Sequence, residues 1–486
     1  MFCERTNPMQ AILKTAAFAA IITAALLLSS CGQDRQAEPN GDAQETYEQA
    51  WAGNIPAEYE ADETSETEDE APALSERDQA WVSDIEHFAW NMRRHPRLNG
   101  LLARMPTVYD YSGGSFRRTL SQVAFFEEER LLEFNERVDD LLARVPELTD
   151  DEILFELLGI SALTACGHTG VDVPIRFFPI AMSWYADGLY AFSAPIQEPD
   201  ALFARLVSIN GIPYSEILDR LRRVIPHYNE YGFLSFHVHR FINNAKFLRH
   251  LGIVPYDLTA RFVMVDVYGY ELAFYLSADD FDWAEDTVSW QQVVDVALRN
   301  TRMDENYFYE FMPEYQALYV RYRSGSQEFG CPIKAEFFER VLYRIEEFGA
   351  SRLVMDIRGL SGHIFQFAAF MDAVNANERL ERVYVLTLPS SFSGGAIVAS
   401  VLQEGIDRAL VVGEPTGSNF NFAGSLYTWT MPNSGVNFYV SRAFLFSRWN
   451  LETGPVMPDV RIPFTIDDLR SNTDPLLDFA LGRGRG

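Results

Sequence analysis

The chain has 486 residues, of which 48% are hydrophobic, and a formal net charge of -29. This length predicts two to three folded units with sizeable cores. The acidic charge argues against nucleic acid as a partner, because binding to phosphates requires clustered lysine and arginine. The spacing of the four cysteines fits no zinc site and no nucleotide-binding motif occurs, so we expect neither a metal nor another cofactor.

Residues 1–31 have the pattern of a bacterial lipoprotein signal peptide. Two basic residues precede an apolar run over residues 16–28, which is too short and too rich in small residues for a membrane span. The run ends in Leu-Ser-Ser-Cys at Cys31, which resembles a lipobox, and Gly32 resembles the next residue of lipoproteins sent to the outer membrane. The resemblance implies a lipid on Cys31 that attaches the protein to the outer membrane of a bacterial cell envelope, facing the periplasm, without spanning the membrane.

Two segments precede the first β-rich region. Residues 32–73 are acidic and poor in large aliphatic side chains, so they cannot bury enough surface to offset their ordering entropy and are predicted to form a disordered tether. Residues 74–166 have the apolar periodicity of helices. Their pattern predicts a long helix over residues 117–142 and then a capping box, in which Thr149 and Glu152 begin another helix.

A glycine-rich stretch, Gly-His-Thr at residues 167–169, follows the helical segment, and its histidine, His168, is predicted to lie on a tight turn. Residues 167–280 are then rich in strand signals. Asn210-Gly211 predicts a hairpin turn, and alternating apolar residues on both sides of Gly269 predict a second hairpin. Taken alone, a histidine in such a loop is most often an ordinary loop residue, so its role depends on the rest of the chain.

Residues 281–486 have the pattern of a layered α/β domain. Apolar strand segments alternate with amphipathic helices, at residues 317–322, 335–348, 353–358, 364–374, 383–388 and 409–413. This alternation is typical of the α/β fold class, in which helices cover a sheet of apolar strands.

Ser393 lies on a sharp turn between a predicted strand and a predicted helix, and Gly394 and Gly395 follow it. The first N–H groups of a helix lack internal partners and the helix dipole favours negative charge, so such a turn can offer an oxyanion site beside an exposed hydroxyl. The two glycines leave that backbone accessible to a substrate. A serine that only caps the helix is the commoner explanation of this pattern when it is considered alone.

The order of these motifs is similar to that of a serine peptidase family, which includes the C-terminal (tail-specific) processing proteases and the tricorn core protease. The similarity rests on Gly-His-Thr at residues 167–169, Ser-Ile-Asn-Gly at 208–211, Asp-Ile-Arg at 356–358 and Gly-Glu-Pro-Thr-Gly at 413–417. It implies a crotonase-like (ClpP/crotonase-type) α/β core at residues 281–486 and a PDZ-like module at residues 167–280. It also implies hydrolysis of peptide bonds in polypeptide substrates through an acyl-enzyme formed on Ser393.

The resemblance also implies which residue is the base. Many relatives place a lysine base in the segment that corresponds to residues 416–419, and this chain has no lysine there. The chain is therefore similar to the tricorn-like branch, in which a histidine activates the serine, and His168 occupies that place. We expect it to act near its ordinary pKa of about 6.5. The acid that orients His168 would be Glu452, with Asp172 and Glu414 as alternatives.

The oxyanion site carries the clearest departure from the family. Its donors would be the backbone N–H groups of Gly394 and Gly362, but His363 stands where relatives have a second glycine. This change could crowd the oxyanion site, and His363 is also a rival base. A second hypothesis is therefore a catalytically inactive relative that binds peptides or scaffolds an envelope complex. The sequence indicates no oligomeric state.

Overall fold

The computed structural model describes residues 74–95, 97–98, 107–112, 117–120, 128–294, 302, 305–325, 334–362, 366–448 and 452–483. Cys31 and the rest of the predicted signal peptide, the acidic segment and His363 lie outside these residues, so the expectations about them stay predictions. No helix within the described ranges is long and apolar enough to cross a bilayer.

A six-stranded sheet forms the centre of the C-terminal half. Its order is β11-β12-β13-β14-β15-β18, with β11 antiparallel to β12 and the other neighbours parallel. The strands are β11 (Tyr307–Met312), β12 (Ala317–Tyr322), β13 (Arg352–Asp356), β14 (Arg382–Thr387), β15 (Ala409–Gly413) and β18 (Val460–Arg461). The central strands are runs of apolar residues because both faces of the sheet are covered.

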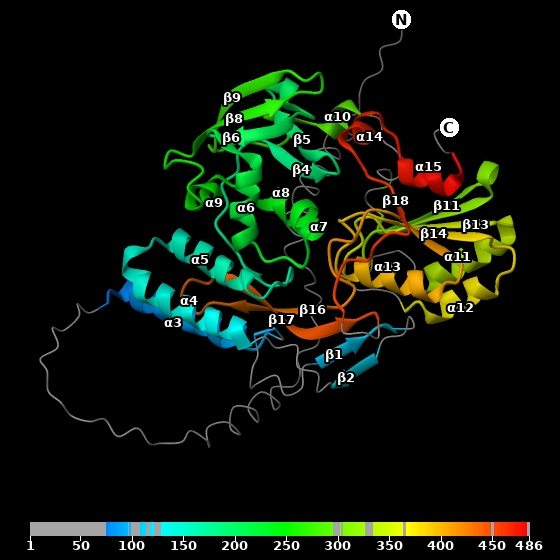
Figure 1. Ribbon diagram of the computed structural model, residues 1–486, viewed down its shortest axis with the longest axis horizontal. Helices are drawn as coiled ribbons and strands as arrows, with labels where there is room; N and C mark the ends of the chain where they lie inside the picture. Colours follow the sequence, from blue (N-terminus) through cyan, green and yellow to red (C-terminus); the bar gives the residue numbers. More distant parts are fainter. Residues whose placement is uncertain are drawn as a thin grey trace, which may run out of the picture. The chain divides into compact units, whose positions relative to one another are not determined.

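Helices cover both faces of this sheet (Figure 1). On one face lie α11 (Lys334–Phe348), α12 (Ala368–Ala376) and α13 (Gly394–Gly405), whose apolar side chains share a core with the strands. On the other face α15 (Pro475–Leu481) packs against Tyr319, Val354, Leu386 and Val412. The predicted α/β layering is therefore confirmed. The predicted helix over residues 364–374 is described from Ala368 onward.

A second sheet lies in the region between the helical segment and the core. It contains β4 (Ala181–Tyr185), β5 (Gly188–Pro195), β6 (Arg205–Ile209), β7 (Ile212–Pro213), β8 (Thr259–Val265), β9 (Glu271–Ser277) and β10 (Thr287–Ser289). Asn210 and Gly211 join β6 to β7 with φ angles of 51° and 78°, as an Asn-Gly hairpin turn requires. The predicted hairpin around Gly269 is β8–β9.

Short helices accompany this sheet. They are η3 (Pro199–Ala201), α6 (Tyr214–Val224), α7 (Glu230–Gly232), the π-helical turn η4 (Phe233–His237), α8 (Val238–Phe241), α9 (Ala245–His250) and α10 (Trp290–Val293). The connection from α6 to η4 contacts the α/β core directly, because a β-carbon on Gly232 would run into the carbonyl of Gly417. A π-helical turn often marks a functional position in a helix.

The third sheet joins the two ends of the described chain. It combines β1 (Thr107–Asp110), β2 (Arg117–Leu120), β3 (Gly170–Val171), β16 (Phe422–Thr430) and β17 (Asn437–Phe446). The prediction of a helix over residues 117–142 was wrong at its start, because Arg117–Leu120 is a strand and α4 spans only Glu128–Arg144. β2 pairs with β1, which pairs with β17, and this pairing across more than three hundred residues overrides the local helical pattern.

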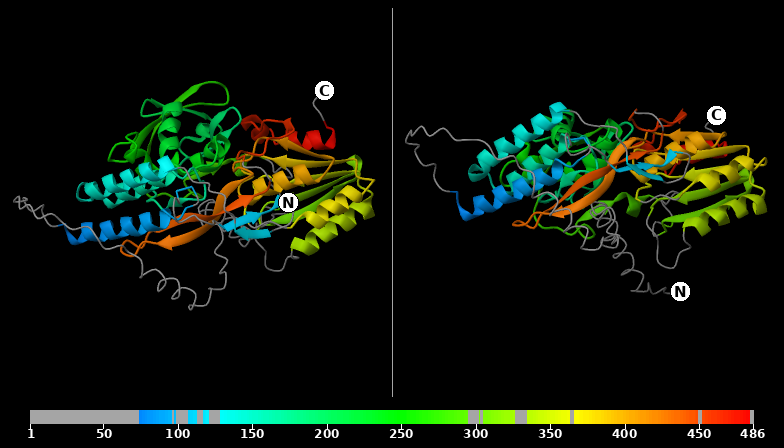
Figure 2. Two further views of the ribbon diagram at one scale, coloured as in Figure 1. Left: turned by 60° about the horizontal axis from the view of Figure 1, so that its bottom comes forward. Right: turned by 90° about the horizontal axis from the view of Figure 1, so that it is seen from below.

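The hairpin β16–β17 bridges the helices and the core (Figure 2). At one end Phe422 and Leu445 belong to the core of the six-stranded sheet. At the other end Met431 and Phe438 pack with α3 (Glu76–Met92), α4 and α5 (Asp150–Ala162). Helix α5 begins with the predicted capping box of Thr149 and Glu152. The remaining short elements are η2 (Val145–Glu147), η6 (Pro313–Tyr315) and α14 (Ile466–Arg470).

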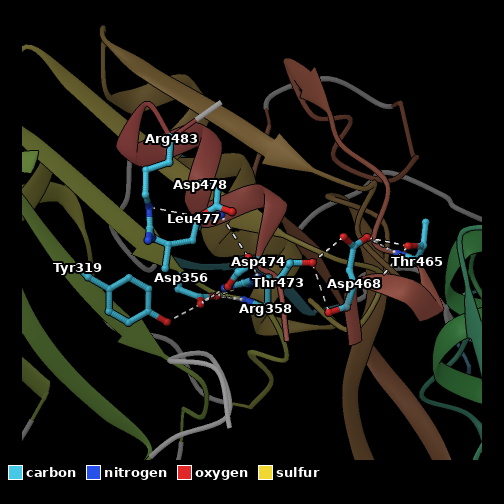
Figure 3. Close-up of polar contacts among 10 residues, drawn as sticks. All are labelled: Tyr319, Asp356, Arg358, Thr465, Asp468, Thr473, Asp474, Leu477, Asp478 and Arg483. Atoms are coloured by element: carbon cyan, nitrogen blue, oxygen red, sulfur yellow. Dashed lines mark hydrogen bonds and ion pairs between the residues drawn. The ribbon is translucent and has the colours of Figure 1, made fainter. Parts of the chain in front are cut away.

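A buried ion network ties α15 to the end of β13 (Figure 3). The Arg358 guanidinium donates to both oxygens of Asp356, at 2.9 and 2.5 Å, and to both oxygens of Asp474, at 2.8 and 2.9 Å. Tyr319 donates to Asp356 Oδ2 at 2.6 Å. Burial opposes the charge of Arg358, but the two carboxylates outweigh it and hold its pKa well above the usual range. The network fixes the start of the loop that leads to Gly362.

Candidate active site

The serine turn, residues 388–395, connects β14 to α13 and carries Ser393 in an unusual backbone conformation. Its φ of 55° and ψ of -112° are strained for a residue with a β-carbon. The strain is held by neighbours: Ser393 N donates to Ser418 Oγ at 2.7 Å, and Phe392 N donates to Leu360 O at 3.0 Å. The conformation leaves the partly exposed Ser393 side chain at the start of α13.

The histidine loop, residues 166–169, brings His168 to this serine although 225 residues separate the two. His168 Nε2 lies 2.8 Å from Ser393 Oγ. The loop follows α5 and enters β3, in which Gly170 pairs with Tyr439 of β17. Since β17 also forms the hairpin that reaches the core, this pairing brings the end of α5 toward the serine turn. The contact between Ser393 and His168 that the family resemblance implied therefore has hydrogen-bond geometry.

The other ring nitrogen of His168 contacts a tyrosine. His168 Nδ1 lies 2.5 Å from the hydroxyl oxygen of Tyr228, and that hydroxyl donates to the carbonyl oxygen of Ala423 at 2.5 Å. Tyr228 belongs to the connection between α6 and α7. The site thus contains a continuous line of polar atoms from Ser393 through His168 and Tyr228 to Ala423.

None of the three acids considered from the sequence bonds to His168. Glu452 is exposed, and its backbone carbonyl accepts from Asn421 Nδ2 at 3.0 Å. Asp172 Oδ1 accepts from the Tyr439 hydroxyl at 2.8 Å. Burial raises the pKa of Glu414 to about 7, and the two ring nitrogens of His168 have Tyr228 and Ser393 as their partners. The expected bond from Glu452 to His168 is therefore not formed, because Tyr228 occupies that nitrogen.

The surroundings of His168 are aromatic. Its ring stacks on Phe392 and Phe422, with centroid distances of 5.1 and 5.6 Å. Burial among these rings disfavours the imidazolium and lowers the pKa of His168 to about 4, instead of the ordinary value expected from the sequence. Burial likewise raises the pKa of Tyr228 well above its usual value. Both side chains are therefore neutral at pH 7, and one ring nitrogen of His168 is free to accept a proton.

Backbone N–H groups lie at the start of α13. Gly394 is the first residue of this helix. Gly362 comes two residues after Leu360, whose carbonyl oxygen accepts the hydrogen bond from Phe392 N in the serine turn. Within the described chain, neither the Gly394 N–H nor the Gly362 N–H donates a hydrogen bond. Gly362 has a φ of 85°, which favours glycine. Gly395 packs so closely on the Leu360 carbonyl that a β-carbon there would clash.

Neither of the two described lysines reaches the serine. Lys246 forms an ion pair with Asp151 at 2.9 Å, and Lys334 donates to the carbonyl of Gly325. The segment at residues 416–419 nevertheless contacts the serine turn, through the Ser418 hydroxyl. No group of histidine, cysteine and acidic residues suited to a metal ion occurs among the residues that the structure describes.

Sequence reasoning missed Tyr228 and Ser418. Tyr228 lies in a loop between two helices, and no motif or periodicity distinguishes it from the other tyrosines of the chain. Ser418 lies in the segment where relatives carry a lysine base, so its position could have suggested a polar contact with the serine turn.

Comparisons with known proteins place the fold. No family model and no curated protein matches the chain. The structure of mature CPAF complexed with lactacystin has a TM-score of 0.53 and 11% identity, over 84% of this chain and 97% of that chain. A second structure of mature CPAF has a TM-score of 0.50 and 13% identity, over 85% and 99%. The photosystem II D1 C-terminal processing protease has a TM-score of 0.34 and 11% identity, over 80% and 94%. The chain thus has a mixed α/β fold with several sheets, similar to that of mature CPAF.

Proposed function

We propose that this protein is a serine endopeptidase of the tail-specific and tricorn-like type, with Ser393 as nucleophile and His168 as base. One observation carries the proposal: the 2.8 Å contact between His168 Nε2 and Ser393 Oγ, on a strained turn at a helix start. The fold likeness to mature CPAF supports it, as do the motifs shared with the peptidase family.

The reaction follows from this geometry. His168 Nε2 takes the hydroxyl proton while Ser393 Oγ bonds to the substrate carbonyl carbon, and the carbonyl oxygen becomes an oxyanion held by the N–H groups of Gly394 and Gly362. The imidazolium then gives its proton to the leaving amine, and the peptide bond breaks to leave an acyl-enzyme. Water loses a proton to His168 and attacks the ester, and Ser393 recovers its proton as the acid product leaves.

The proposed setting of this reaction is the cell envelope. A lipid on Cys31 would anchor the chain, the acidic residues 32–73 would act as a tether, and residues 167–280 would form a PDZ-like module beside a crotonase-like core. A module of that type takes an extended peptide as an added strand, which suits an unfolded polypeptide substrate. Replacing Cys31 with Ala should leave an unprocessed precursor, and an unchanged mass and membrane fraction would contradict the anchor.

A fluorophosphonate probe tests the chemistry directly, because it labels only an activated serine. We expect labelling and hydrolysis of an unfolded polypeptide by the wild-type protein, and loss of both in Ser393→Ala. Ser390→Ala is a matched control on the same turn and should keep both activities. If the probe does not label Ser393 and no polypeptide is hydrolysed, the results would favour a catalytically inactive relative that binds peptides. His363, which stands where relatives have a glycine, points to the same alternative.

A further inference from the structure

The hydrogen bonds beyond His168 determine where the protons of the site lie. The carbonyl oxygen of Ala423 can only accept a hydrogen bond, so at 2.5 Å the single hydroxyl proton of Tyr228 points toward it. The hydroxyl oxygen therefore presents a lone pair to His168 Nδ1, which lies 2.5 Å away. A lone pair on Nδ1 would face that oxygen repulsively. Nδ1 must therefore carry the proton of the neutral ring.

We propose that Tyr228 is a positioning residue that holds His168 as the Nδ1–H tautomer, the role that the sequence assigned to an acid. In this tautomer Nε2 has a free lone pair, and it faces Ser393 Oγ at 2.8 Å. The other tautomer would present an N–H to the serine hydroxyl and could not accept its proton. The inference rests on the proposed function for its catalytic consequence, while the tautomer itself can be measured without any reaction.

A neutral partner suits the surroundings of this ring. Phe392 and Phe422 contact both His168 and Tyr228, and a carboxylate buried there would need a compensating charge. Burial raises the pKa of Tyr228, so the phenol keeps its proton at neutral pH. When Nε2 gains the serine proton, the Nδ1–H bond to Tyr228 becomes charge-assisted and therefore stronger. No proton leaves Nδ1 at any stage.

The ring of Tyr228 is held independently of its hydroxyl. Its centroid lies 5.8 Å from that of Phe392 and 5.2 Å from that of Phe422, and its Cδ2 atom packs beside Gly167. The thiol of Cys166 lies 3.4 Å from the hydroxyl oxygen. Replacing Tyr228 with Phe should therefore remove the hydrogen bonds and keep the packing, which separates the positioning role from a structural one.

The test measures kinetics and tautomer together. In Tyr228→Phe we expect kcat to fall roughly 10²- to 10⁴-fold, by analogy with loss of the residue that fixes the tautomer in a Ser-His-Asp triad, with KM unchanged. Nitrogen-15 NMR of the imidazole should show the proton on Nδ1 in the wild type and a mixture of tautomers in the variant. Tyr439→Phe also loses one tyrosine hydroxyl bond, to Asp172, and should keep the wild-type kcat and tautomer.

Each outcome decides one question. An Nε2–H tautomer in the wild type overturns the inference, even if Tyr228→Phe does not fold. A variant with wild-type kcat and an unchanged tautomer overturns it as well. If the wild type itself hydrolyses nothing and Ser393 does not react with the fluorophosphonate probe, the proposed function fails, while the NMR result still decides whether Tyr228 sets the tautomer.

Discussion

The two halves of the site are built in different ways. The serine half is one continuous piece of chain, in which β14, the serine turn and α13 follow each other directly. The histidine half is assembled from three separate segments, which supply His168, Tyr228 and Ala423. The position of Ser393 therefore follows from one strand–turn–helix segment that Leu360 and Ser418 hold in place, whereas the position of His168 depends on docking between distant elements.

The largest expected effect tests whether the two halves act as one unit. Ser393→Ala and His168→Ala should each lower kcat by roughly 10⁴-fold or more, and the double variant should be hardly worse than either, because members of one catalytic unit are not additive. Steady-state kinetics on an unfolded polypeptide measures this. If the fold-losses of kcat in the two single variants multiply in the double variant, the two residues act independently.

His363 provides the alternative within this experiment. It lies outside the described residues, and its replacement with Ala should lower kcat less than the replacement of His168. The reverse ranking would assign the base to His363 and leave the histidine half without a catalytic role.

A smaller effect concerns the buried ion network of Arg358, Asp356 and Asp474, which lies at the start of the loop that leads to Gly362. Arg358→Met leaves Asp356 and Asp474 buried without their cation, which should lower the free energy of unfolding by about 3–5 kcal/mol. Arg470→Met is the matched control, because its pair with Asp467 is exposed and such pairs contribute about 0–1 kcal/mol. Urea unfolding compares the two. Equal losses would show that the ion network does not stabilise the α/β core.

The smallest effect is a pH dependence that reports on the histidine half. The pKa of His168 is about 4 in the folded protein and about 6.5 when unfolded. Between pH 6.5 and pH 4 His168 is therefore protonated in the unfolded chain but not in the folded chain. The free energy of unfolding falls as the pH drops through this range, and His168 contributes up to about 1.4 kcal/mol per pH unit to the fall. The slope should be shallower in His168→Gln.

The low pKa of His168 should also determine the pH below which kcat/KM falls. The wild-type kcat/KM should stay level from pH 7 down toward pH 5 and fall only near pH 4, where His168 becomes protonated. A fall between pH 6 and 7 would indicate an unperturbed histidine and would contradict the role of burial among Phe392 and Phe422.

The sequence predicted the serine half well because its signals are local. Apolar strand, small-residue turn and helix follow each other, and the structure contains them where the pattern indicates. The contact of His168 with Ser393 was predicted only through the resemblance to a family. Tyr228 was missed because it meets His168 from a distant segment, and strand β2 was missed because it joins the sheet through β1, whose other partner β17 lies more than three hundred residues away. The low pKa of His168 was missed for the same reason, because the rings that bury it come from other elements.

One consequence follows from the way Gly232 meets Gly417, which in turn lies against the carbonyl of Pro389. At these two glycines the segments touch through main chain, and beside them the side chain of Asn229 donates to Asn419 Oδ1 at 2.9 Å. A methyl group at either glycine should push the segment that carries Tyr228 away from the serine turn and weaken its contact with His168, while the sequence keeps both Ser393 and His168. Such a variant is suited to capturing uncleaved polypeptides, which mass spectrometry can then identify.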